Sequence, residues 1–130
     1  MKRDMDIIRA LMLKLEALPA DGHRIFGVAA TDEELAVAGA SVDQIDYHLR
    51  LLRDQGFLDS PGQPSLSGKY PFRGITWAGH DFVDSIRDDD VWSKTKTQAE
   101  KVGSWTVDIL AGIAKAVVKA KLKAVTGLDI

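Results

Sequence analysis

The sequence predicts a mainly α-helical protein with one small β-hairpin, because three adjoining features follow one another along the chain. An amphipathic segment over residues 41–55 ends at a glycine and is followed at once by a short apolar strand at residues 57–60. A tip rich in Pro, Gly and Ser then leads into a second short strand, which turns into a new helix near Trp77. This order is typical of a winged helix-turn-helix domain. We predict that domain over residues 1–87, with a C-terminal helical extension over residues 88–130.

The segments before the helix-turn-helix complete such a domain. Apolar residues at three- to four-residue spacing predict a first helix over residues 4–18. The segment 23–29 predicts a short strand, the usual partner of a wing hairpin. Thr31 and Glu34 have the spacing of a capping box, which predicts a short helix over residues 32–38.

The second helix of the helix-turn-helix would be the recognition helix. Ser41 and Gln44 form a second capping box at its start, and Gly56 stops it. The face expected to be buried consists of Val42, Ile45, Leu49 and Leu52. The hairpin is expected to pair Phe57-Leu58 with Ile75-Thr76-Trp77, and three of the four prolines lie between these strands, as suits a hairpin tip.

The C-terminal extension is expected to hold two helices. The run Asp88–Asp90 is read as the cap of a helix that starts near Val91 and breaks at Gly103. The last helix, over residues 104–125, is strongly amphipathic, with several lysines opposite a broad apolar arc. We expect it to be a dimerisation or docking helix, with a membrane-surface helix as the weaker alternative. Its docking residues would be Leu110, Ile113, Val117 and Val118.

Composition bounds the classes of function. The 130 residues are 45% hydrophobic and 28% charged, as in an ordinary folded domain, and they include no cysteine. Thiolate chemistry is therefore excluded, and the lack of cysteine favours a reducing compartment, which predicts a cytoplasmic protein. The chain has no run of eighteen consecutive apolar residues, so no transmembrane segment is expected. Residues 1–90 carry ten Lys/Arg and sixteen Asp/Glu, whereas residues 91–130 carry seven and three. The predicted reading domain is therefore acidic, which is unusual for a DNA-binding protein.

Three phrases resemble those of a known family. MKRDMDIIR at the start, YHLRLLRDQGFLD in the middle and GITWAGHDFVDSIRDDDVW later occur in the order found in family 2513 of the domains of unknown function. The resemblance extends over about residues 1–100. It implies a winged-helix-like fold in a bacterial or phage protein, and it carries no catalytic residues.

The recognition helix and the wing hold the candidate DNA-binding residues. Side chains of these types hydrogen-bond to base edges or phosphates. Asp43 and Asp46 in the first turns of the helix would face phosphates unfavourably. The candidate set is Ser41, Gln44, Tyr47 and Arg50 on the helix with Lys69 and Arg73 on the wing.

No residue pattern in the chain indicates an enzyme. His80 and Asp84 lie four residues apart, but a zinc site needs three or four ligands, so neither a metal nor a cofactor is expected. Trp77, Trp92 and Trp105 are expected to pack in a core or an interface rather than to stack on bases. The leading hypothesis is a homodimeric, non-enzymatic regulator that binds double-stranded DNA. The alternative is a protein-interaction module of phage or defence origin that does not bind nucleic acid.

Overall fold

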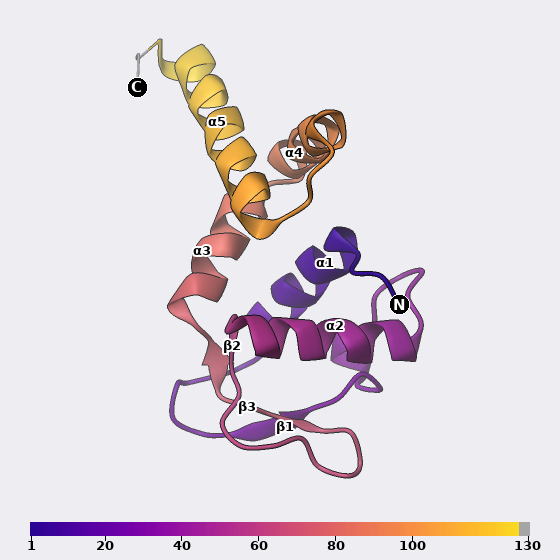
Figure 1. Cartoon of the computed structure of the whole chain (residues 1–130). Helices are drawn as coiled ribbons and strands as arrows, with labels where there is room; N and C mark the ends of the chain where they lie inside the picture. The colour runs from indigo at the N-terminus through magenta and orange to yellow at the C-terminus, as the bar shows by residue number, and fades with distance from the viewer. Residues whose placement is uncertain (128–130) are drawn as a thin grey trace. The chain divides into compact units, whose positions relative to one another are not determined.

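The computed structural model of the protein, described over residues 1–127, is mainly helical with short antiparallel strand pairs (Figure 1). The chain divides into two compact units, residues 1–81 and the residues from Phe82 onward. The predicted boundary at residue 87 thus falls later than the division, which lies within one helix. The elements, in chain order, are α1 (Met5–Glu16), β1 (Phe26–Val28), the 3-10 helix η1 (Glu33–Leu35), α2 (Val42–Gln55), β2 (Leu58–Asp59), β3 (Tyr70–Phe72), β4 (Gly74–Ile75), α3 (Trp77–Ile86), α4 (Asp89–Val102) and α5 (Val107–Thr126).

Helix α1 begins one residue after the predicted start of the first helix, and Asp4 caps it. The Asp4 carboxylate accepts hydrogen bonds from the backbone N–H of Asp6 (2.9 Å) and of Ile7 (3.4 Å), which satisfies two donors of the first turn. The helix packs against α2 and η1. Its apolar face is buried as expected and consists of Met5, Ile7, Ile8, Leu11, Met12 and Leu15.

The capping box of α2 is confirmed, but the buried face of the helix is shifted from the predicted one. Gly56 ends the helix in the left-handed conformation (φ 82°), which a residue with a side chain rarely adopts. Val42 was expected in the core and is 49% exposed, whereas His48 is fully buried. Viewed down the helix axis, the buried arc of α2 is centred on the direction shared by Ile45 and Leu52. Position 48 lies within this arc, and position 42 lies at its edge.

His48 joins the two long helices of the first unit. Its Nε2 accepts a hydrogen bond from the Asp4 backbone N–H at 2.8 Å, and its Nδ1 lies 2.6 Å from the Gln44 carbonyl oxygen. A backbone amide can only donate and a carbonyl can only accept, so Nδ1 carries the proton of a neutral ring. Both ring nitrogens are thus satisfied within the core.

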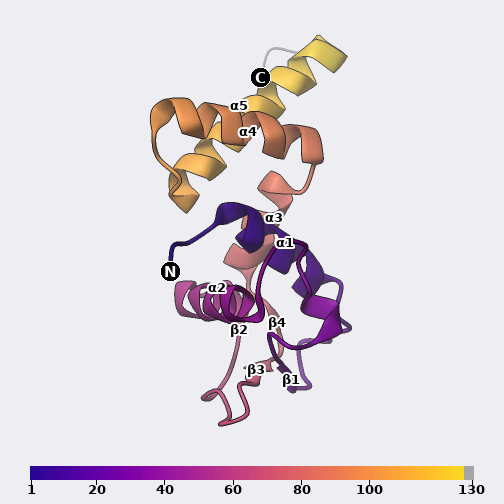
Figure 2. The same ribbon diagram turned by 90° about the vertical axis from the view of Figure 1, so that its right-hand side faces the viewer.

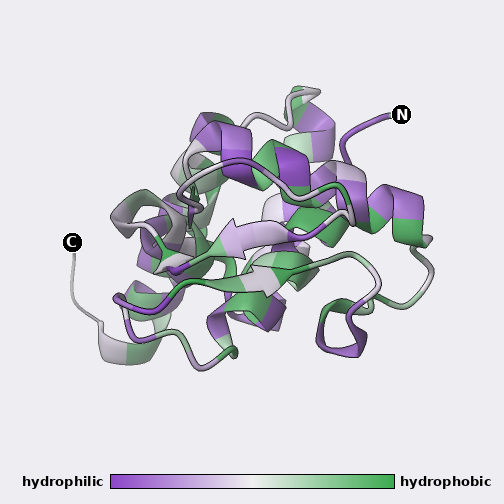
Figure 3. Cartoon of the chain, turned by 90° about the horizontal axis from the view of Figure 1, so that it is seen from below, coloured by the Kyte–Doolittle hydropathy of each residue, from purple (hydrophilic) through white to green (hydrophobic). Residues whose placement is uncertain are grey.

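The strands differ from the predicted hairpin in their pairing. β2 pairs with β4, as expected, whereas β3 pairs with β1 in the register Phe26↔Phe72, and only Arg73 separates β3 from β4. Seen from below, β1 and β3 lie side by side (Figure 3). Pro71 was expected in the hairpin tip but lies within β3, which tolerates it because β3 is paired along one side only. Trp77 was expected to end a strand or to begin a helix, and it is the first residue of α3.

The short helix expected over residues 32–38 is reduced to one 3-10 turn. Asp32 precedes it in place of Thr31, and its carboxylate accepts a hydrogen bond from the Ala29 N–H (2.9 Å) rather than from the turn itself. A segment this short, without a side-chain cap, forms i→i+3 bonds more readily than a full α-helical turn. Leu35 is the buried residue of the turn.

The second unit consists mainly of α4 packed against α5, and the two helices cross in the view of Figure 2. Asp88 caps α4 by accepting from the Val91 N–H at 2.9 Å, and Gly103 ends the helix in the left-handed conformation. Helix α5 begins at Val107 rather than at residue 104, because Thr106 supplies the side-chain cap. Its fully buried residues are Leu110 and Ala114.

Candidate nucleic-acid interface

The outer face of α2 carries opposite charges side by side. Four residues spaced by three or four positions lie opposite the buried arc, and we call them the α2 surface. Three of them are exposed and the tyrosine is half-buried. Two of the four are carboxylates, so the face that would enter a DNA groove is not positively charged. The α2 surface consists of Asp43, Tyr47, Arg50 and Asp54.

Ser41 and Gln44, two of the predicted base-reading residues, are used in the helix cap. The Gln44 N–H donates to Ser41 Oγ (3.1 Å), and the Ser41 N–H donates to Gln44 Oε1 (2.8 Å). Releasing such a cap costs roughly 1 kcal/mol. These side chains therefore begin α2, and their acceptor oxygens are already used in the cap.

Arg50 lies among partners that offset its charge. Its side chain is 63% exposed, and its Nη2 lies 4.0 Å from the Asp46 carboxylate. A hydrogen bond to Tyr70 and the nearby charges of Asp46 and Asp54 raise the pKa of Arg50. The Tyr70 hydroxyl in turn donates to Asp46 at 3.1 Å, and burial raises the pKa of this tyrosine. The guanidinium is thus accessible but locally neutralised.

Two other arginines bind β2 and the loop that follows it. Arg73 pairs with Asp59 in a bidentate arrangement, with Nε–Oδ2 at 2.8 Å and Nη2–Oδ1 at 3.2 Å, and this pairing raises the pKa of Arg73. Arg53 donates from Nε to Ser60 Oγ at 3.1 Å and from Nη2 to the Gly62 carbonyl. No local sequence signal predicts this anchoring of Arg53, because its partners lie seven and nine residues away in a loop.

Lys69 lies in the loop just before β3. It is exposed, and its aliphatic stem lies over Gly27, where an added Cβ would be 3.1 Å from the Lys69 Cδ. No carboxylate in residues 1–127 forms an ion pair with its ammonium group. Of the six predicted DNA-contacting residues, Lys69 and Tyr47 are therefore the ones whose polar groups are not already used inside the domain.

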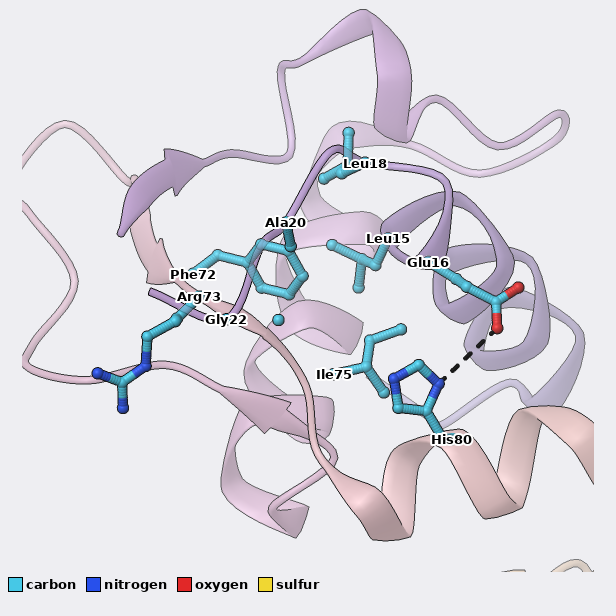
Figure 4. A pocket seen from close by; sticks show the side chains of 10 residues that line it. Leu15, Glu16, Leu18, Ala20, Gly22, Phe72, Arg73, Ile75 and His80 are labelled. Atoms are coloured by element: carbon cyan, nitrogen blue, oxygen red, sulfur yellow. Dashed lines mark ion pairs between the residues drawn. The ribbon is translucent and has the colours of Figure 1, made fainter. Parts of the chain in front are cut away.

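A shallow pocket of about 210 Å³ lies in the first unit, between the end of α1, the β3–β4 segment and the start of α3 (Figure 4). Its floor is apolar, with Leu15, Phe72 and Ile75, and His80 at its rim has Nδ1 4.0 Å from Glu16 Oε2. Across residues 1–127, no group of three His, Asp or Glu side chains is placed to hold a metal ion. The pocket combines one loose His–Glu pair with aliphatic walls, and this arrangement specifies no reaction.

The three tryptophans do not share one environment. Trp92 is buried (4% exposed), as expected, and Trp105 is 37% exposed. Trp77 is 84% exposed, so it does not lie in the core, and its expected packing in an interface stays a prediction. It directly follows Thr76, whose hydroxyl donates to the Gly56 carbonyl at the end of α2 (2.7 Å). That bond holds the start of α3, and with it Trp77, at the C-terminal end of α2.

The predicted docking residues of α5 divide into two groups. Leu110 is fully buried, and Ile113 and Val117 are half-buried. Val118 remains 45% exposed. The helix thus uses part of its apolar arc within its own unit. No helix in the described part of the chain is long and apolar enough to cross a membrane.

Comparisons with known proteins agree with the resemblance seen in the sequence. An uncharacterized protein of Haemophilus influenzae (strain ATCC 51907 / DSM 11121 / KW20 / Rd) is 29% identical over 124 residues, which cover 94% of this chain and 99% of the relative. No solved structure matches. The model of the family described as "Hypothetical protein (DUF2513)" matches residues 2–105. The chain therefore belongs to the DUF2513 family.

Proposed function

We propose that this protein is a non-enzymatic, cytoplasmic winged-helix protein that acts by binding another protein through the α2 surface. Support for the winged helix comes from the order of elements in residues 1–81 and from the strand pairing. The strand before the helix-turn-helix pairs with the returning strand of the hairpin, and that strand continues into the segment that pairs with β2.

One observation carries the choice of a protein over DNA: the cations around α2 are already paired. Arg50 lies beside Asp46 and Asp54, Arg53 holds the wing loop, and Arg73 forms a bidentate pair with Asp59. DNA affinity depends on cations that replace the counterions of phosphates. A surface with alternating charges instead suits a partner of mixed charge, in which each group meets its opposite.

The residue types on this surface fit the same proposal. Tyrosine, tryptophan and arginine are enriched among the residues that dominate binding energy at protein interfaces. The Tyr47 ring packs edge-on against buried His48, with centroids 5.6 Å apart, so part of its position is fixed before a partner arrives. Trp77 adds a second exposed aromatic ring at the C-terminal end of the same helix.

Site-specific photocrosslinking tests the proposal. A photoreactive phenylalanine analogue at position 47, in the full chain expressed in its native cells, is expected to yield one dominant protein adduct. The matched control places the analogue at Ala17, an exposed position at the end of α1. The adduct should disappear when Arg50 is replaced by Ala. Equal adducts at both positions, or an adduct that survives Arg50→Ala, would refute a docking role for the α2 surface.

DNA binding is the second candidate, and the wing favours it. Lys69 projects from the wing without an acidic partner in residues 1–127, and Tyr47 and Arg50 are accessible on the helix. Fluorescence anisotropy with a pool of random duplexes tests this candidate at low salt. Binding that weakens steeply with salt and is reduced by Lys69→Gln would establish it, since each phosphate contact contributes about one unit to the salt slope. Absence of binding at about 50 mM salt excludes it.

A further inference from the structure

Helix α5 is only half covered by its own unit. Leu110 and Ala114 in its first half are fully buried, and α4 is the element packed against them. From Val118 to Gly127 every residue is exposed. The last turns of α5 extend clear of α4 in both views (Figures 1 and 2).

The exposed half nevertheless carries an apolar stripe. Val118, Leu122 and Val125 are spaced by four and three residues, which places them on one face of the helix. Their side chains are 45%, 40% and 78% exposed. Aliphatic residues in this register form a surface that is stabilised when it is removed from water.

Lysines surround this stripe on both sides. Lys115, Lys119 and Lys123 lie along one flank, and Lys121 lies on the other, where its Nζ is 3.5 Å from both Asp88 and Asp90. Asp108 is the sole acidic residue between Val107 and Thr126. Long lysine side chains can bury their stems along an apolar surface while the ammonium groups reach anions at its edge.

We infer that the second half of α5 docks on the surface of an anionic phospholipid membrane. An apolar stripe with Lys115, Lys119 and Lys123 along one flank is complementary to acyl chains bordered by negative headgroups, while Lys121 on the other flank is paired with Asp88 and Asp90. A second copy of the helix is the poorer occupant, because it would bring lysine flanks together. The exposed surface of three aliphatic side chains is also far smaller than the roughly 800 Å² per partner that a stable protein interface buries. This inference is independent of the α2 surface.

Vesicle flotation of the full chain tests the inference. The protein is expected to float with vesicles of phosphatidylglycerol and phosphatidylcholine in equal parts and to stay behind with vesicles of phosphatidylcholine alone. Lys119→Gln should weaken binding about fivefold, as expected for one lysine charge near an anionic surface. Lys101→Gln is the matched control. It removes an equal charge from an exposed position on α4 and should leave binding unchanged.

A second variant tests the apolar stripe. Leu122→Asp should abolish flotation, while circular dichroism should show unchanged helicity because position 122 does not face α4. Failure of the wild-type chain to float with anionic vesicles at low salt would overturn the inference. Equal binding to both vesicle types, or equal loss in Lys119→Gln and Lys101→Gln, would also overturn it. A stable dimer in solution that Leu122→Asp dissociates, without any vesicle binding, would show that a second copy covers the stripe.

Discussion

Helices α2 and α5 are built from similar patterns but are used differently. Both are amphipathic, and both begin with a side-chain cap and end at a left-handed glycine. Helix α2, with 14 residues, buries Ile45, Leu49 and Leu52 to 3% exposure or less. Helix α5, with 20 residues, fully buries only Leu110 and Ala114.

The difference lies in the packing partners. Helix α2 packs against α1 and β2, whereas α4 is the main element packed against α5. An amphipathic pattern states that a helix has a face to bury, and the surrounding elements decide how much of it is buried. The part of the apolar face of α5 that is not buried remains exposed at the surface.

The largest expected effect compares one leucine from each helix. Leu49→Ala should lower the free energy of unfolding by about 3 kcal/mol, because it removes a fully buried side chain and leaves a cavity. Leu122→Ala should change it by less than about 0.5 kcal/mol, because that side chain is already exposed. Urea titrations followed by circular dichroism measure both. A large loss for Leu122→Ala would mean that the second half of α5 is packed.

Two glycines within helices should respond to alanine with opposite signs. A Cβ at Gly79 in α3 would overlap the Phe57 carbonyl oxygen and the Ile75 side chain, so Gly79→Ala should destabilise by about 1–3 kcal/mol. Gly112 in α5 has open space around it, so Gly112→Ala should stabilise by up to about 1 kcal/mol through helix propensity. Thermal melting distinguishes the two. A lower Tm for Gly112→Ala would contradict the open surroundings of α5.

The smallest expected effect concerns acid. A hydrogen bond from Val91 N–H and the charge of Lys121 lower the pKa of Asp88, and Lys94 with Lys121 lowers that of Asp90, each from an ordinary 3.8. Carboxylates with a lowered pKa stabilise the fold above their unfolded pKa, and this contribution is lost as the pH falls through the folded value. Helicity of the second unit should therefore decline below about pH 4.

Replacing one lysine isolates that effect. Lys121→Gln should reduce the acid dependence, because it removes one of the charges that lower both pKa values. Lys119→Gln removes a charge from the exposed side of the same helix and should leave the dependence unchanged. Hydrogen exchange of α4 amides at pH 7 and pH 3 measures the difference. An identical response of the two variants would argue that Lys121 does not contribute.

Cap and stop residues predicted the helix boundaries well, whereas contacts between distant segments were difficult to predict from the sequence. Asp4, Ser41, Asp88, Gly56 and Gly103 act within a few residues of their own position, and the structure places each at the predicted end of a helix. The exceptions depend on packing. The buried face of α2 includes His48 rather than Val42, and β1 pairs with β3, a strand that includes Pro71.

The candidate site shows the same division. Sequence reasoning named Arg50, Lys69 and Arg73 as candidate cations. In the structure Arg50 and Lys69 are exposed, and Arg73 is half-buried. Sequence reasoning did not foresee that Asp59 would pair with Arg73 or that Asp46 would bind Tyr70, because those partners are 14 and 24 residues apart. Pairing of this kind depends on chain reversals that no local pattern specifies.

By itself, the sequence determined the family, the mainly helical class, the capped ends of α2 and α4, and the amphipathic character of α5. Those properties follow from neighbouring residues within one or two turns of a helix. Only the tertiary structure decided which charges around α2 are neutralised and which half of α5 remains uncovered. Both depend on distances between segments far apart in the chain, and these distances change the proposed partner of the α2 surface from DNA to a protein.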